Sequence, residues 1–106
     1  DAAVADKQAE QIAIKRAAFT QLAQQRLDEM ARDHGYDSII SLASYATDPD
    51  PVFSVEGQYG VAMRSQTWAT LRVIMADVLA GTRTMPADFS ELEPELPVIN
   101  WPTGSA

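Results

Sequence analysis

The chain has 106 residues, and its 15 acidic and 8 basic side chains give a formal net charge of -7 at pH 7. A hydrophobic fraction of 46% is ordinary for one soluble globular domain and argues against disorder over the whole length. The absence of cysteine excludes disulfides and Cys-ligated zinc, the single histidine excludes a multi-histidine metal site, and the acidic balance argues against nucleic-acid binding.

The ends of the chain and its hydropathy give no sign of a membrane protein. No stretch reaches the roughly 18 apolar residues that a membrane span needs, so no membrane partner is expected. The first residues lack the basic start and apolar core of a signal peptide. Because the chain begins at Asp1 without an initiator Met, we expect a processed product, a fragment or a chain trimmed at its start.

The first predicted element is a long helix over residues 3–33, which contains neither Gly nor Pro. A narrow stripe with partial seven-residue spacing suits a helical hairpin or coiled-coil seam, and it consists of Ala5, Ile12, Phe19, Ala23 and Met30. The half of the helix before Phe19 has little apolar surface to bury. We therefore expect residues 1–25 to project, to fray or to pack on a partner.

A short, central second helix is predicted over residues 38–47. Gly35 ends the first helix, with His34 in its last turn, and Asp37 is the expected N-cap of the second. Apolar residues cover nearly every face of this segment, so it should be surrounded by the rest of the domain.

The third predicted helix runs over residues 51–80, with Asp50 as its N-cap and Pro51 at its first position. Its predicted broad apolar face contains Phe53, Gly57, Gly60, Val61, Trp68, Leu71, Met75, Val78 and Leu79. Two glycines about one turn apart indicate close approach of another backbone, most simply the second helix. The alternative is a frayed or kinked first turn.

Arg64 lies within this predicted face and must therefore either reach an acid or reach the surface. Candidate acids are Asp37, Glu56 and those of the tail. A functional contact between Arg64 and a partner protein is the third option.

Residues 84–106 form an acidic, proline-rich tail with four acidic and no basic side chains. We expect it to run extended across the helices, anchored by Trp101, with one helical turn near Ser90. The acids should be solvated or face a basic partner.

No catalytic, cofactor-binding or metal-binding residue emerges from the sequence. His34 beside Asp33, Asp37 and Ser38 is better explained by a helix terminus than by a catalytic dyad. The acids Glu91, Glu93 and Glu95 occur together in one segment, whereas a glycosidase pair needs opposite walls of a cleft.

From Arg26 to Pro102 the chain carries a set of short motifs. These are Arg26-Leu27-Asp28, Gly35-Tyr36-Asp37-Ser38-Ile39, Ser44-Tyr45-Ala46, Phe53 with Glu56-Gly57-Gln58, Trp68, Gly81-Thr82-Arg83, and Glu95-Leu96-Pro97 with Trp101-Pro102. Together they resemble small proteins encoded in tail-fibre regions of tailed phages and prophages. The resemblance implies a virion tail component or a tail-fibre assembly accessory such as a chaperone, located in the virion tail or in the host cytoplasm during assembly. It carries no catalytic residues.

These observations predict an all-α fold with a projecting segment (1–25), a helical core (26–83) and a tail (84–106). The predicted function is non-enzymatic contact with a phage tail or tail-fibre protein, and a homo-oligomer through the first helix is a further option. The alternative is an inhibitor or binding module directed at a host protein. The candidate partner-binding residues are Ile12, Phe19, Arg64 and Trp101.

Overall fold

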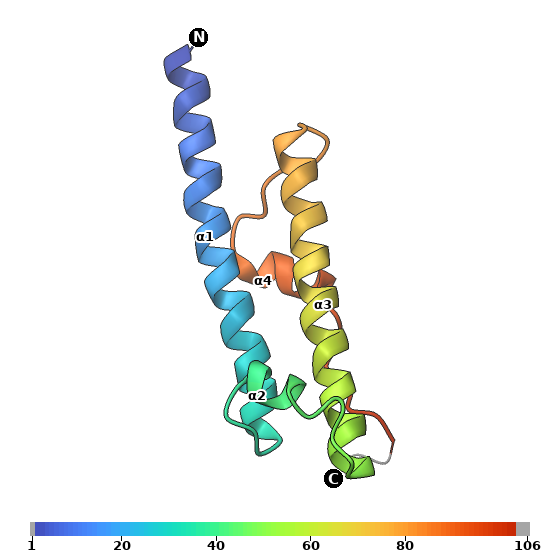
Figure 1. The fold of residues 1–106 in the computed structure, drawn as a ribbon. Helices are drawn as coiled ribbons and strands as arrows, with labels where there is room; N and C mark the ends of the chain where they lie inside the picture. Colours follow the sequence, from blue (N-terminus) through green and yellow to red (C-terminus); the bar gives the residue numbers. More distant parts are fainter. Residues whose placement is uncertain (1, 104–106) are drawn as a thin grey trace.

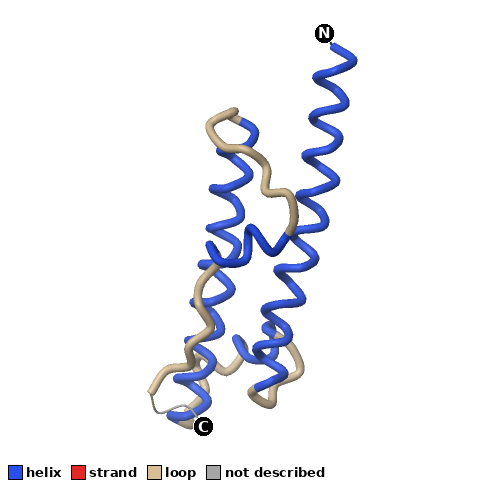
Figure 2. The backbone as a smooth tube through the Cα atoms, turned by 180° about the vertical axis from the view of Figure 1, so that it is seen from behind, coloured by secondary structure: helices blue, strands red, loops and turns tan. Residues whose placement is uncertain are grey.

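The computed structural model describes residues 2–103, and within them every regular element is a helix. The elements are α1 (Ala2–Asp33), α2 (Ile39–Ala43), α3 (Pro51–Leu79), α4 (Phe89–Leu92) and the 3-10 helix η1 (Glu93–Glu95). The predicted all-α fold is confirmed (Figures 1 and 2).

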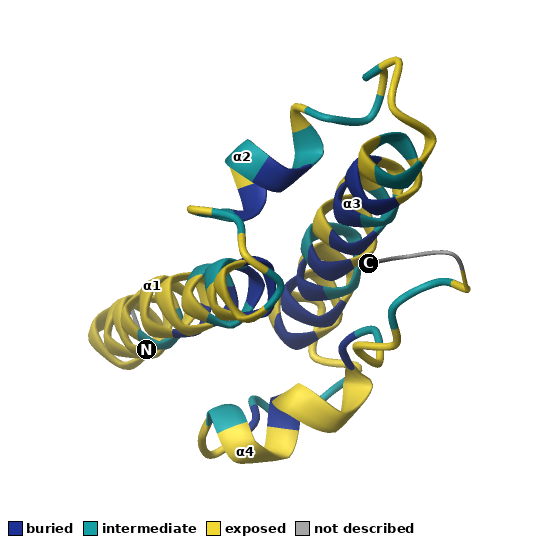
Figure 3. Cartoon of the chain, turned by 90° about the horizontal axis from the view of Figure 1, so that it is seen from below, coloured by how far each residue is buried: buried dark blue, intermediate teal, exposed yellow. Residues whose placement is uncertain are grey.

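The two long helices, α1 and α3, run antiparallel and form the body of an elongated molecule with principal extents of 59 × 22 × 22 Å (Figure 1). Viewed along their axes, α2 and α4 lie on opposite sides of this pair (Figure 3). The N-terminal turns of α1 extend beyond the end of α3 (Figure 1).

The helix boundaries follow local capping chemistry. The carboxylate of Asp50 accepts hydrogen bonds from the amides of Val52 and Phe53, which confirms the predicted start of α3. The predicted N-cap Asp37 is wrong, because the hydroxyl of Ser38 caps α2 instead. The α-helix α2 also ends earlier than predicted, at Ala43, and the chain continues in turns to residue 47.

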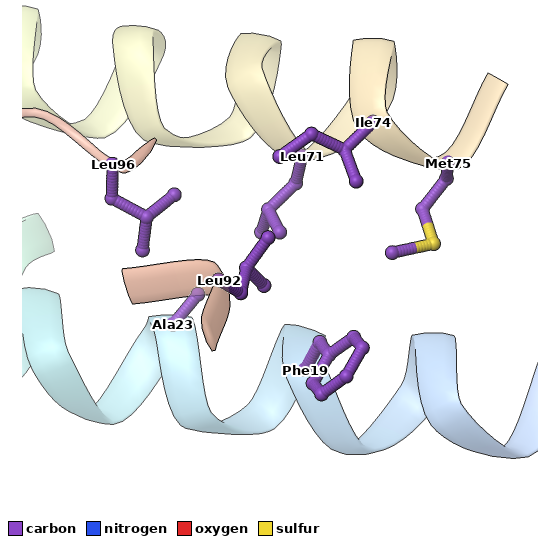
Figure 4. Close-up of a cluster of buried hydrophobic side chains, with 7 residues drawn as sticks. All are labelled: Phe19, Ala23, Leu71, Ile74, Met75, Leu92 and Leu96. Carbon is purple, nitrogen blue, oxygen red and sulfur yellow. The ribbon is translucent and has the colours of Figure 1, made fainter. Parts of the chain in front are cut away.

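Two buried apolar clusters hold the helices together. The first joins α1 and α3 to α4 and the residue after η1, and Figure 4 shows its members, which are Phe19, Ala23, Leu71, Ile74, Met75, Leu92 and Leu96. The second lies toward α2 and contains Leu27, Met30, Ala31, Ile39, Leu42 and Met63. Phe19 and Ala23 are core residues, so the buried part of α1 begins at residue 19, within the segment 1–25 that was expected to project.

Both glycines of α3 are sites of close approach by another segment, and at Gly57 the approaching group is backbone, as predicted. A Cβ atom on Gly57 would lie 2.3 Å from the backbone nitrogen of Ala46, and one on Gly60 would lie 2.6 Å from the Leu42 side chain. The contacts come from α2 and the turns that follow it, so the frayed-turn alternative is wrong.

The buried face of α3 is rotated relative to the predicted one. Met63, Thr67 and Ile74 are buried, whereas three residues of the predicted face are exposed, namely Phe53, Val61 and Leu79. Arg64 is also exposed, and among residues 2–103 no carboxylate pairs with it. The chain covers one side of the apolar surface of α3 and leaves the other side open.

The tail is fixed along the length of the helices. Lys15 donates hydrogen bonds to the carbonyls of Pro86 and Ala87, and Arg26 donates one to the carbonyl of Pro97. Arg26 also pairs with Glu93 at 3.3 Å. The tail is therefore not purely extended, since α4 and η1 interrupt it, and part of its acidic charge is matched within the chain.

Candidate functional site: an open groove and a buried polar cluster

An apolar groove follows the seam between α1 and α3 on the part of the pair farthest from α2. It consists of two adjoining hollows of about 290 and 450 Å³ that share Arg16, Thr20 and Met75. We call this surface the seam groove, and its lining residues are Ala9, Ile12, Ala13, Arg16, Ala17, Phe19, Thr20, Trp68, Leu71, Arg72, Met75 and Leu79. No residue of α4 or of the described part of the tail lines it.

The sequence explains why this seam stays open. The α1 wall is built mainly of alanines before Phe19, and their short side chains fill little of the space between the two helices. On the opposite wall, Leu79 is 62% exposed. Leu79 is therefore an apolar residue of the seam groove that the chain does not cover by itself.

Two guanidinium groups flank the apolar floor of the smaller hollow. Arg16 comes from α1 and Arg72 from α3, and both side chains are exposed. Among residues 2–103, no carboxylate lies within ion-pair distance of either group. The floor between them includes the half-buried ring of Trp68.

A polar cluster closes the other end of the helix pair. The carboxylate of Glu56 is only 2% exposed, and it accepts a hydrogen bond of 2.7 Å from the Tyr36 hydroxyl. Its second oxygen lies 2.7 Å from Nε2 of His34. Burial, followed by the hydrogen bond to Glu56, raises the pKa of Tyr36 well above its ordinary value. The cluster ties the segment after α1 to the first turns of α3.

Trp101 brings the tail into the same cluster. Its ring stacks on His34 with a centroid separation of 3.7 Å and an interplanar angle of 12°. It also contacts the ring of Tyr59 at 5.0 Å, and the Tyr59 hydroxyl accepts a hydrogen bond from the amide of Asn100. The side chain of Trp101 therefore packs on the second core cluster.

Sequence patterns did not predict this cluster. His34 was expected to serve the carbonyls at the end of α1, but backbone amides of Gly35 and Tyr36 do this, with Gly35 at a φ of 93°. Glu56 was considered only as a partner of Arg64. The position of Glu56 could have indicated its burial, because it immediately precedes Gly57 on the helix face that another backbone was predicted to approach.

A hollow of about 340 Å³ adjoins the cluster and is lined in part by Asp37, Ser41 and Phe53. A His–carboxylate contact is one component of general acid–base sites. Here the contact between His34 and Glu56 belongs to a cluster that joins the segment after α1, the helix α3 and the tail. Each polar side chain of the cluster has a partner within it, which is the pattern of a structural contact.

Two of the four predicted partner-binding residues, Ile12 and Phe19, line the seam groove, and the other two do not. Ile12 lines the seam groove and is half-buried, while Phe19 contributes to its floor but is only 4% exposed, so its role is mainly in the core. Arg64 lies on the exposed surface of α3 and does not line the groove. Trp101 lies at the opposite end of the molecule, in the polar cluster.

The described part of the chain contains no group of three His, Asp or Glu side chains arranged to hold a metal ion. None of its helices has the length and apolar content that crossing a bilayer requires. Comparison with protein-family models, with curated proteins and with solved structures gives no match.

Proposed function

We propose that this chain is a non-enzymatic protein-contact module that binds a partner helix in the seam groove. The observation that carries the proposal is the open apolar surface between α1 and α3, with Ile12 on one wall and Leu79 on the other. A long helix gains most of its stability from packing an apolar face, and the N-terminal half of α1 lacks such packing within the chain.

The biological setting that we propose is a phage tail. The motifs between residues 26 and 102 resemble proteins encoded in tail-fibre regions, and a contact function fits both a virion component and a transient assembly chaperone. The setting rests on this resemblance, while the contact function rests on the groove, so the two parts of the proposal are tested separately.

Co-expression tests the contact function. The tagged chain is produced together with each protein encoded beside it, and the purified material is analysed by size-exclusion chromatography with light scattering. We expect one neighbour to form a complex of fixed stoichiometry. A chain that stays monomeric in every mixture would contradict the proposal. Presence of the chain in purified particles would then distinguish a virion component from a chaperone.

A pair of variants assigns the contact to the groove. The Ile12→Ser/Leu79→Ser double variant removes apolar surface from both walls and should abolish the complex. Val73→Ser is the matched control, since Val73 is a 54% exposed apolar residue of α3 that does not line the groove. It should bind as the unmodified chain does. Equal binding by both variants would place the contact elsewhere.

A further inference from the structure

We infer that the partner segment is an amphipathic helix whose apolar stripe is flanked by carboxylates, with an acidic side chain held between Arg16 and Arg72. This inference rests on the proposed function and specifies the chemistry of the partner. The groove is long enough to hold such a helix. Between Ala9 and Thr20, α1 rises about 16 Å, which matches about three turns of a partner helix.

The apolar floor calls for apolar anchors. Phe19, Leu71 and Met75 present buried or nearly buried apolar surface at the base of the hollow, and Trp68 adds a half-buried ring. A helix that lies in a seam of this kind inserts side chains at positions i, i+3, i+4 and i+7. Such a helix would complete a three-helix arrangement with α1 and α3.

The charged side chains at the edge of the groove favour a partner helix that carries acidic residues beside its apolar stripe. The whole chain carries -7, yet the two exposed charged side chains that line the groove are both arginines, one on each wall. The basic residues that face the tail are used within the chain, because Lys15 bonds to backbone carbonyls and Arg26 and Arg83 pair with glutamates. Guanidinium groups bind carboxylates with two parallel hydrogen bonds, so Arg16 and Arg72 are suited to a carboxylate that enters between them.

Two synthetic helical peptides of about 14 residues test the inference. They share one leucine stripe and differ only in flanking residues, which are Glu in one and Lys in the other. Binding to the full chain is measured by fluorescence anisotropy of the labelled peptides. We expect the Glu-flanked peptide to bind about tenfold more tightly, as two exposed ion pairs would give, and its advantage to decrease as salt is raised.

The Arg16→Glu/Arg72→Glu double variant should lose or reverse this preference. Arg64→Glu is the matched control, because Arg64 is another exposed arginine of α3 outside the groove, and it should keep the preference. Circular dichroism and thermal unfolding establish that both variants are folded.

Three results would overturn the inference: equal binding of the two peptides, no binding of either at millimolar concentration, or a groove-dependent dimer of this chain, which would make a second copy the occupant. The co-expression experiment distinguishes failure of this inference from failure of the proposed function. If a co-expressed partner binds through the groove but ignores the Arg16→Glu/Arg72→Glu change, only the acidic flanks are wrong. If no partner binds at all, the contact function itself fails.

Discussion

The two ends of the α1–α3 pair differ in how completely their apolar surfaces are covered. At the end near α2, Gly57 and Gly60 allow the chain to pack directly against α3, and Glu56 is buried in contact with His34 and Tyr36 from the segment after α1. At the other end, the seam is lined by alanines and by the exposed Leu79. We call these the closed end and the open end.

The difference indicates a division of work within one small domain. The closed end joins α1, α2, α3 and the tail through contacts that span most of the sequence. The open end leaves apolar surface that the described residues do not cover, and exposed apolar patches are common at interaction sites. We therefore expect mutations at the two ends to separate stability from the proposed binding.

The largest expected effect comes from Phe19, where the packed part of α1 begins. Phe19 is 4% exposed in the first core cluster, and truncation of a buried phenylalanine leaves a cavity. We expect Phe19→Ala to lower the free energy of unfolding by about 3–5 kcal/mol, measured by urea denaturation. Leu22→Ala, three residues along the same helix and 38% exposed, should cost less than about 1 kcal/mol. Similar losses for both would mean that this part of α1 is not packed as described.

The closed end depends on the missing side chain of Gly57. Its Cβ would lie 2.3 Å from the Ala46 backbone nitrogen, so Gly57→Ala forces the two backbones apart. We expect a loss of about 3 kcal/mol despite the better helix propensity of alanine. Ser65→Ala is the control for propensity alone, since Ser65 is exposed on α3. A Gly57→Ala variant as stable as the unmodified chain would contradict the close approach.

The buried polar cluster should make the closed end sensitive to alkaline pH. The pKa of Tyr36 is raised above the ordinary tyrosine value of 10.0, so its neutral form is favoured in the folded state. The stabilisation is fully present below pH 10.0 and is lost as the pH rises from there through the folded-state pKa. At neutral pH, Tyr36→Phe should cost about 1–2 kcal/mol, because the hydrogen bond to Glu56 is lost.

Denaturation of both proteins from pH 8 upward measures this effect. The difference between the unmodified chain and Tyr36→Phe should shrink above pH 10.0. Tyr45→Phe serves as the control, since the Tyr45 hydroxyl has no hydrogen bond among residues 2–103, and this variant should keep the alkaline loss. A difference that is constant with pH would show that Tyr36 titrates equally in the folded and unfolded states.

Local rules in the sequence were sufficient to predict the two long helices, but not the cap and the end of α2. The Asp50-Pro51 start of α3, the Gly35 stop of α1 and the close approach at Gly57 each depend on neighbouring residues or on a single glycine. The rotation of the buried face of α3 could not be predicted in this way. It depends on where α1 and the tail lie, and periodicity alone gives the width of an apolar face but not which part of it is covered.

The residues of the candidate site also come together only through the tertiary fold. Glu56 and His34 are 22 positions apart, so their pairing depends on how the segment that contains α2 connects α1 to α3 rather than on a motif. The seam groove combines two observations that the sequence contained separately, namely the weakly apolar start of α1 and an apolar face on α3 that is wider than one contact needs. Their combination was visible only when both helices were placed.

The smallest expected effect on stability is at the open end. Ile12 is half-buried against the groove, and alanine is a better helix former than isoleucine. We therefore expect Ile12→Ala to change the free energy of unfolding by no more than about 0.5 kcal/mol, in contrast to Phe19→Ala one stripe position later. Hydrogen exchange provides a second measurement, because amides of residues 4–16 should exchange faster than those of residues 20–31. A decrease of more than about 2 kcal/mol in the free energy of unfolding, or equal protection from hydrogen exchange along α1, would contradict this expectation. The open end would then contribute to folding as the closed end does.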